Sequence, residues 1–300
     1  MLIYKKRNTF LQGLHPAAGI SLLLIYLIAF LVIKNPIYLL IILASLVLLA
    51  VIDGCIYDLM EYAKLILPFV ILVMILNPLI VHNGSTVLYK GHFNIPVLGT
   101  LRITLEAVMY GIFNGLRVIS LTLVFGFANL IVNPDKSFSF FSKYLRKSAL
   151  LMNMTIRLFP TLAKKYTHIT EIERLRGNIV IDKNIKNKIK KQGNIVNILF
   201  LSSIEDAGDM AESMYSRGYG IGKRSVYFNM SLCLWDTVII LTSIFTAVYL
   251  KLFQMWGLNK MMFYPRVDNP INNLTFNGLM FTVLFFIPTV VNWGWKQWKY

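Results

Sequence analysis

The sequence predicts an all-α, polytopic membrane protein with about six transmembrane helices and a cytoplasmic module of two long amphipathic helices. Of its 300 residues, 56% are hydrophobic and only 15% are charged, against roughly 25% charged residues in a typical soluble domain. The net charge is +16, which is typical of membrane proteins with basic cytoplasmic loops. This composition argues against a disordered chain, a soluble enzyme and a nucleic-acid-binding protein. Two cysteines are too few for a disulfide framework or a zinc site.

Six apolar segments are candidate transmembrane helices, because a helical span needs about 20 apolar residues to cross roughly 30 Å of hydrocarbon. The first two are separated only by the turn 34–36, so we expect a tight helical hairpin. The third segment contains Pro68 and Pro78, and the sixth contains Pro288 near its end. The predicted spans are residues 17–33, 37–52, 65–81, 105–132, 232–250 and 274–292.

The distribution of Lys and Arg predicts the orientation of these spans. With the N-terminus inside, the inner segments hold twenty-three basic residues and the outer segments hold six. Because cytoplasmic loops carry an excess of Lys and Arg, both termini are predicted to be cytoplasmic. The expected location is the cell membrane of a prokaryote.

The spans divide the chain into three parts: a four-span region at 1–132, a cytoplasmic module at 133–230 and a two-span region at 231–300. The middle part has a net charge of +9 and is where function is expected, since the spans mainly anchor the chain. No metal site is expected, because the four histidines are scattered and none stands at metal-ligand spacing from another ligand. No cofactor and no nucleic-acid partner are expected either.

Two amphipathic helices are predicted in this middle part, at about 143–176 and 195–217. In the first, apolar residues recur at spacings of three and four, which indicates one face of an α-helix. Pro160 is expected to kink or restart that helix, and Gly177 suits the position just beyond its end. The Lys-rich stretch 178–192 between the helices is open to two interpretations, a basic turn at the lipid surface or a solvated loop.

The two predicted helices end in the same pattern, Glu-x4-Arg-Gly. Its members are Glu171 with Arg176-Gly177, and Glu212 with Arg217-Gly218. One explanation is structural, since Arg in a last turn favours the helix dipole and Gly caps the helix. The other is a shared docking role, because two copies in one insertion are less easily explained by capping alone.

These motifs resemble the transmembrane T component of energy-coupling factor (ECF) transporters, a branch of the ABC importers. In that family two Arg-Gly motifs end two cytoplasmic coupling helices. The stretch 206–219, DAGDMAESMYSRGY, is similar to the second motif, and Arg157-Leu-Phe-Pro160 is similar to the Arg-x-x-Pro that usually stands before the first coupling helix. Leu14-His-Pro16 and Gly115-Leu-Arg117 resemble the entry to the first span and an intramembrane Arg. Leu175 and Ser216 depart from the Ala that often precedes each Arg-Gly.

The resemblance implies a scaffold without enzymatic activity of its own. Its partners would be two cytoplasmic ATPases, identical or different, one substrate-binding membrane subunit (the S component) and the lipid bilayer, and its task would be uptake of a vitamin or metal ion. The implied ATPase-docking residues are Arg176, Gly177, Arg217 and Gly218, supported by Glu171, Glu212, Arg157 and Pro160. We expect the S component to contact the apolar and small residues Leu158, Leu162, Ile204, Ala207 and Ala211.

Two alternative functions are an ordinary ABC permease with its own substrate path and an intramembrane lipid-processing enzyme that uses Asp53 and Asp58. The glycine-rich stretch 218–225 fails the phosphate-loop pattern, because only three residues separate its first Gly from Gly-Lys and Arg224 follows. Arg117 within the fourth span should face protein, because a central charge costs about 2.5–3.5 kcal/mol on insertion scales. Asp236 is its hypothetical partner.

Overall fold

A computed structural model describes residues 7, 9–81, 84–95, 99–177, 185–219, 221, 232–257, 261–271 and 274–298. The chain divides into two units, one made of Met1–Ser137 with Met230–Tyr300 and the other of Phe138–Asn229. The first is called the span unit below, and the second the long-helix unit.

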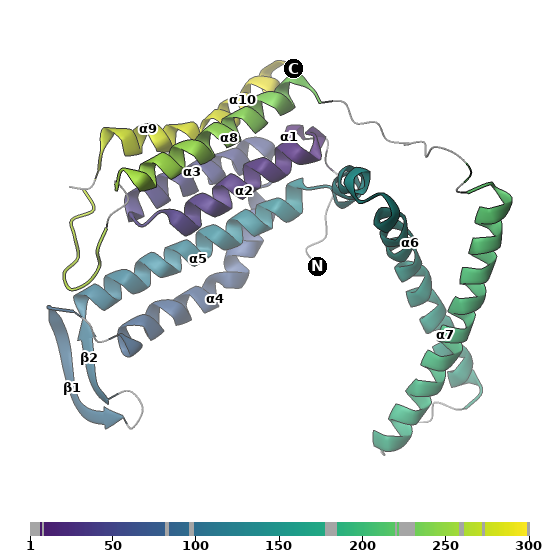
Figure 1. Ribbon diagram of the computed structural model, residues 1–300. Helices are drawn as coiled ribbons and strands as arrows, with labels where there is room; N and C mark the ends of the chain where they lie inside the picture. Colours follow the sequence, from purple (N-terminus) through teal and green to yellow (C-terminus); the bar gives the residue numbers. More distant parts are fainter. Residues whose placement is uncertain are drawn as a thin grey trace. The chain divides into compact units, whose positions relative to one another are not determined.

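The span unit is built from apolar helices that lie side by side (Figure 1). Five helical segments in the described part of the chain are long and apolar enough to cross a membrane, and a sixth apolar helix, α2, has 17 residues. Each overlaps one predicted span, although the third, α4, begins at Ile56 and not at residue 65, and the polytopic all-α class is confirmed. The elements are α1 (Phe10–Gly13), α2 (Pro16–Val32), α3 (Pro36–Asp53), α4 (Ile56–Ile80), α5 (Leu105–Ile131), α8 (Leu234–Met255), α9 (Phe276–Leu284) and α10 (Ile287–Trp298).

Local capping signals set the helix ends of the predicted hairpin. Pro16 and Pro36 begin α2 and α3, where a missing N–H costs nothing. The side chains of His15 and Asn35 accept hydrogen bonds from backbone amides in the first turns. Gly54 ends α3 with φ +77°, a left-handed conformation that favours glycine. The turn between α2 and α3 is therefore short, and its own residues Asn35 and Pro36 begin α3.

Aromatic rings fill the core of the span unit. Tyr26 is fully buried, and its hydroxyl lies 3.1 Å from the Ser45 Oγ and donates to the Phe285 carbonyl at 3.0 Å. Phe281 stacks on Phe253 with ring centroids 5.7 Å apart, and Tyr38 meets Phe253 edge to face at 5.8 Å. These contacts bring α2 and α3 together with α8 and α9, so the last predicted spans pack directly on the first two.

Helices α4 and α5 pack closely because glycines line their contact. A Cβ at Gly111 would lie 3.0 Å from the Met74 carbonyl oxygen, and one at Gly115 would lie 2.5 Å from the Met74 Cε. The spacing Gly-x3-Gly allows backbones of membrane helices to approach. Much of the remaining surface of α4 is exposed and apolar, including Leu65, Phe69 and Ile80, which suits contact with lipid or with another protein.

A short antiparallel hairpin, β1 (Val87–Ile95) and β2 (Gly99–Thr104), precedes α5. The sequence analysis assigned no structure to this loop. Glu106, in the first turn of α5, anchors the hairpin, since it accepts hydrogen bonds from Ser85 Oγ (3.1 Å) and from the Thr86 amide (3.1 Å) and hydroxyl (2.8 Å).

The long-helix unit contains most of α6 (Pro134–Leu175) and all of α7 (Ile185–Ser216), which cross one another (Figure 1). Both start earlier than predicted. The Asn133 carbonyl and side chain accept hydrogen bonds in the first turn of α6, and Pro134 follows as a helix-starting residue. The helix is not restarted at Pro160, because one missing backbone hydrogen bond is a small loss in 42 residues. The described half of the Lys-rich stretch 178–192 is helical and belongs to α7.

Replacing Gly111 by Leu should destabilise the span unit by about 1–3 kcal/mol, because an added side chain meets the fixed Met74 backbone and forces overpacking. The measurement is the thermal midpoint of the purified chain in detergent. Gly19→Ala is the matched control, since a Cβ at Gly19 in α2 meets nothing within 4 Å. Equal midpoints for Gly111→Leu and the wild type would contradict the close packing of α4 and α5.

Candidate functional site

Both long helices end with the same local geometry. Gly177 and Gly218 have φ values of +74° and +70°, and each stands directly after an Arg at the end of its helix. The Gly177 amide donates to the Arg174 carbonyl at 3.1 Å. The Gly218 amide donates to the Tyr215 carbonyl at 2.9 Å, and the next amide, of Tyr219, donates to the Met214 carbonyl at 3.0 Å, which completes a Schellman motif. The capping role expected of both glycines is therefore confirmed.

The two Arg side chains project from these caps into solvent. The side chain of Arg176 is 68% exposed and makes a weak ion pair, with Nη1 3.5 Å from Glu173 Oε1. Arg217 is also exposed. The nearby Leu175 and Tyr215 are 88% and 86% exposed. Each helix end thus presents a guanidinium next to an exposed apolar side chain, a combination that a solvated surface alone does not require.

The predicted supporting residues lie on the same helices. Glu171 and Glu212 are exposed, and the acid that contacts Arg176 is Glu173, three residues away. Sequence analysis missed this contact, although the i, i+3 spacing could have indicated it. Pro160 is an exposed residue within α6. Arg157 also belongs to α6, but its side chain lies outside the described part of the chain.

An open apolar groove of about 500 Å³ lies between α6 and α7. Of the five residues predicted to contact another membrane subunit, Leu158, Leu162, Ala207 and Ala211 line this groove, whereas Ile204 is exposed and does not. The remaining lining residues are Leu151, Met154, Thr155, Ser203, Asp206, Met210, Met214, Tyr215 and Tyr219.

One polar contact joins the two helices beside this groove. The Lys165 Nζ of α6 forms an ion pair with Asp206 of α7 and donates to Ser202 Oγ at 2.9 Å. Among the described residues, this is the only ion pair between α6 and α7. Sequence analysis did not single out these residues, because their pairing spans 41 positions and leaves no local pattern.

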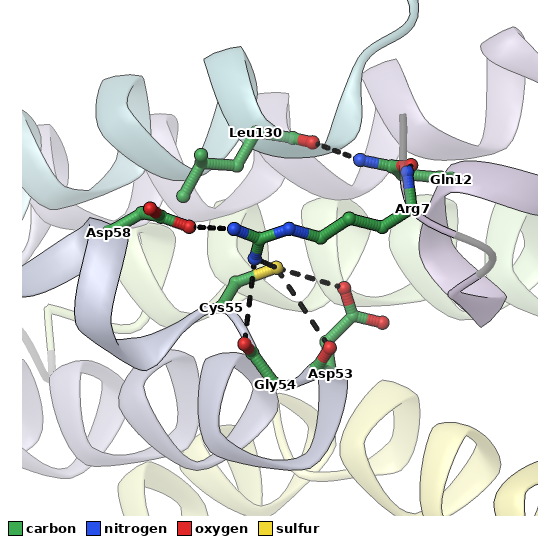
Figure 2. Close-up of polar contacts among 7 residues, drawn as sticks. All are labelled: Arg7, Gln12, Asp53, Gly54, Cys55, Asp58 and Leu130. Atoms are coloured by element: carbon green, nitrogen blue, oxygen red, sulfur yellow. Dashed lines mark hydrogen bonds and ion pairs between the residues drawn. The ribbon is translucent and has the colours of Figure 1, made fainter. Parts of the chain in front are cut away.

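A second polar cluster ties the start of the chain to the turn between α3 and α4 (Figure 2). The Arg7 guanidinium pairs with Asp58 and donates to the Gly54 carbonyl at 3.5 Å and to Cys55 Sγ at 3.2 Å. The Cys55 thiol in turn donates to Asp53 Oδ2 at 3.4 Å. The two carboxylates considered for an intramembrane enzyme are therefore engaged with Arg7 and Cys55, as expected of a structural network.

Gln12 extends this cluster to the C-terminal end of α5. The Gln12 Nε2 donates to the Leu130 carbonyl at 2.8 Å (Figure 2), and the backbone carbonyl of Gln12 accepts a hydrogen bond from Lys136 Nζ at 3.1 Å. The first described residues thus contact three elements distant in sequence: the turn after α3, the end of α5 and the first turn of α6.

The hypothetical pair of Arg117 and Asp236 is wrong. Arg117 Nη2 donates to the Ile33 carbonyl at 2.7 Å, and its guanidinium carbon lies 4.6 Å from the centre of the Phe113 ring. Asp236 instead caps α8, accepting from the amides of His15 (2.8 Å) and Cys233 (2.9 Å). Because His15 and Ile33 flank opposite ends of the 17-residue α2, about 25 Å of helix separates the two charges.

These features define a polytopic helical membrane protein that carries two long, exposed helices with matching Arg-Gly ends. The family model described as cobalt transport protein, CbiQ, matches residues 7–228. The chain belongs to this family.

Several curated relatives are named energy-coupling factor transporter transmembrane protein. The chain is 27% identical to the one from Macrococcus caseolyticus over 60% of its own length and 72% of the relative's. It is 22% identical to the Staphylococcus aureus protein, over 85% and 96% of the two chains. For the Bacillus subtilis protein the identity is 26%, over 64% and 74%. The resemblance to ECF T components is thereby confirmed, as is the assignment to a multi-pass cell-membrane transporter subunit.

Cys55 should resist alkylation at neutral pH. Burial and the nearby Asp53 raise the pKa of this thiol to about 11, so that about one thousandth of it is thiolate, the reactive form, at pH 8. In the folded protein iodoacetamide should therefore modify the exposed Cys233 and spare Cys55, with the Cys55 rate rising as the pH approaches 11. Mass spectrometry of alkylated peptides measures both rates.

Two controls accompany this measurement. The Cys233→Ser variant isolates Cys55, and unfolding in SDS should make both thiols react at similar rates. Equal rates for Cys55 and Cys233 in the folded protein at pH 8 would contradict the cluster drawn in Figure 2.

Proposed function

We propose that this chain is the transmembrane scaffold of an ECF importer, coupling ATP hydrolysis by two cytoplasmic ATPases to movement of a substrate-binding S component during uptake of a vitamin or metal ion. The observation that carries the proposal is the pair of exposed Arg side chains, Arg176 and Arg217, each placed by a left-handed Gly at the end of a long helix. Two equivalent ends suit two ATPase subunits.

Arginine is well suited to such docking. Its planar guanidinium stays charged when it is buried and forms paired hydrogen bonds with carboxylates. A groove lined by Asp or Glu on each ATPase would complement this charge, and the exposed Leu175 and Tyr215 would add apolar contact. The glycines Gly177 and Gly218 hold the last turn, while Glu171, Glu212, Arg157 and Pro160 would support the helices that carry the two ends.

The groove between α6 and α7 is proposed to contact the S component. Its apolar lining includes Leu158 and Leu162, and its small residues Ala207 and Ala211 would allow close approach of another helix. Ile204, exposed on α7, would contribute outside the groove. The substrate itself would be bound by the S component.

The proposed orientation has both termini and the part at 133–230 in the cytoplasm, with four spans before it and two after it. Its support is the excess of Lys and Arg in the inner segments. This arrangement presents the Arg-Gly ends to the compartment that contains ATP.

Reversing the charge of the docking residues should release the ATPases. We expect Arg176→Glu and Arg217→Glu each to weaken the complex and the double variant to abolish it, since losing a buried, paired Arg costs about 2–5 kcal/mol. The chain is co-expressed with candidate ATPases and purified in detergent, and the ATPase retained per chain is measured. Arg174→Glu, an exposed Arg on the last turn of α6, is the matched control.

Equal ATPase retention by all variants would reduce the Arg-Gly ends to helix caps. A folded wild-type chain that retained no ATPase would instead contradict the scaffold function itself.

Filling the groove should block assembly with the S component. Ala207→Trp places a bulky side chain among the groove residues and should reduce the S component that co-purifies, while leaving the ATPases bound. Ala163→Trp is the control, because Ala163 is exposed on α6 and does not line the groove. An intact complex with Ala207→Trp would show that the S component binds elsewhere.

A further inference from the structure

We infer that Lys165, together with Asp206 and Ser202, forms a pivot that sets the separation of the two Arg-Gly ends. These are positioning residues, and the inference rests on the proposed function of those ends. The pivot is the point at which polar contacts join α6 and α7.

The contact has the geometry needed to hold a crossing. Ser202 and Asp206 are four residues apart, so they lie on the same face of α7 one turn from each other. The Lys165 Nζ reaches both, which limits sliding along α7 as well as separation from it. The side chains of Lys165 and Asp206 are 29% and 38% exposed, so the pair is partly shielded from solvent.

The apolar groove cannot set the crossing by itself. Hydrophobic contacts are non-directional, and the groove is open, with Met154, Met210 and Met214 among its lining residues. Methionine side chains adapt to many packings. The charged, hydrogen-bonded contact therefore supplies the directional constraint that the groove lacks.

The pivot also lies at the same number of residues from each Arg-Gly end. Arg176 follows Lys165 by eleven residues, and Arg217 follows Asp206 by eleven residues. At 1.5 Å per residue, each Arg-Gly end lies about 16 Å along its helix from the pivot. The two C-terminal ends leave the crossing in different directions (Figure 1).

Equal lever arms have a mechanical consequence. When two ATPases attached to the ends approach each other on binding ATP, the helices turn about the pivot, and the groove beside it changes its opening. Without the pivot, α6 and α7 would slide past each other, and each ATPase would move only the helix to which it is bound. The pivot thus couples the movements of the two helices.

The first experiment measures the separation of the ends in the chain alone. Spin labels at Leu175→Cys and Tyr215→Cys, both highly exposed, are placed in the Cys233→Ser background, and the distance distribution is recorded by double electron–electron resonance. We expect a broader or displaced distribution in Lys165→Asp and in Asp206→Lys. The exchanged pair, Lys165→Asp with Asp206→Lys, should restore the wild-type distribution. Lys164→Asp, at an exposed neighbouring position, is the control.

The second experiment uses the same variants, without spin labels, in complex with the ATPases. Because the Arg-Gly ends are intact, ATPase retention should be unchanged, whereas the rate of ATP hydrolysis per complex should fall about tenfold in the two single variants, within the usual range for coupling between sites. The exchanged pair should recover the rate.

The outcomes separate the pivot from the proposed function. A distance distribution in the single variants identical to that of the wild type overturns the pivot, as does a changed distribution with unchanged ATP hydrolysis. If the wild-type chain binds no ATPase, the proposed function fails, and the distance measurement alone still decides whether Lys165 and Asp206 set the separation.

Discussion

The absence of water in the bilayer core is the constraint on which the rest of this structure depends. Each backbone N–H and C=O in a span must be satisfied within the protein, so the apolar segments are helices, and the turns that join α2, α3 and α4 are short. His15, Asn35 and Gly54 satisfy or redirect the backbone where α2 and α3 begin and end. Side chains with charge inside the spans follow the same requirement, and Arg117 donates to the Ile33 carbonyl that the end of α2 leaves free.

The long-helix unit is built under a different constraint. A helix with few neighbours is stabilised mainly by the one face that it buries, yet α6 and α7 leave much of their apolar surface exposed and meet at one polar contact and one open groove. Exposed apolar surface of this extent is typical of interaction sites. In the function proposed above, the Arg-Gly ends and the groove would be the two parts of this unit that contact other subunits.

The polar cluster at Arg7 has a structural role within the span unit. The N-terminal segment contacts the turn after α3 through Arg7 and the end of α5 through Gln12 (Figure 2), and the Gln12 backbone also meets the first turn of α6. Hydrogen bonds to charged groups contribute more than neutral ones, so this segment holds these helix ends of the span unit together. Asp53 and Asp58 are explained by that role, which removes the main motive for assigning them a catalytic one.

The sequence by itself determined the spans and the two Arg-Gly ends, because both depend on local properties. Hydropathy over about 20 residues identifies a span wherever it packs, and a Gly after an Arg at the end of an amphipathic run caps a helix without long-range help. Asn133 and Pro134 are also local signals for the early start of α6. The predicted boundary is later than the observed one because apolar periodicity begins only after the first turns of the helix.

Only the tertiary structure decided which distant residues meet. The partner of Arg117 lies 84 positions away, that of Arg7 lies 51 positions away, and Lys165 meets Asp206 across 41. Charge and burial in the sequence indicated that Arg117 needed a partner, but opposite charge was the wrong guide, since a backbone carbonyl at a helix end accepts equally well. Such pairings depend on how helices are placed side by side, and that placement results from the sum of packing contacts over the whole unit and from no single pattern in the chain.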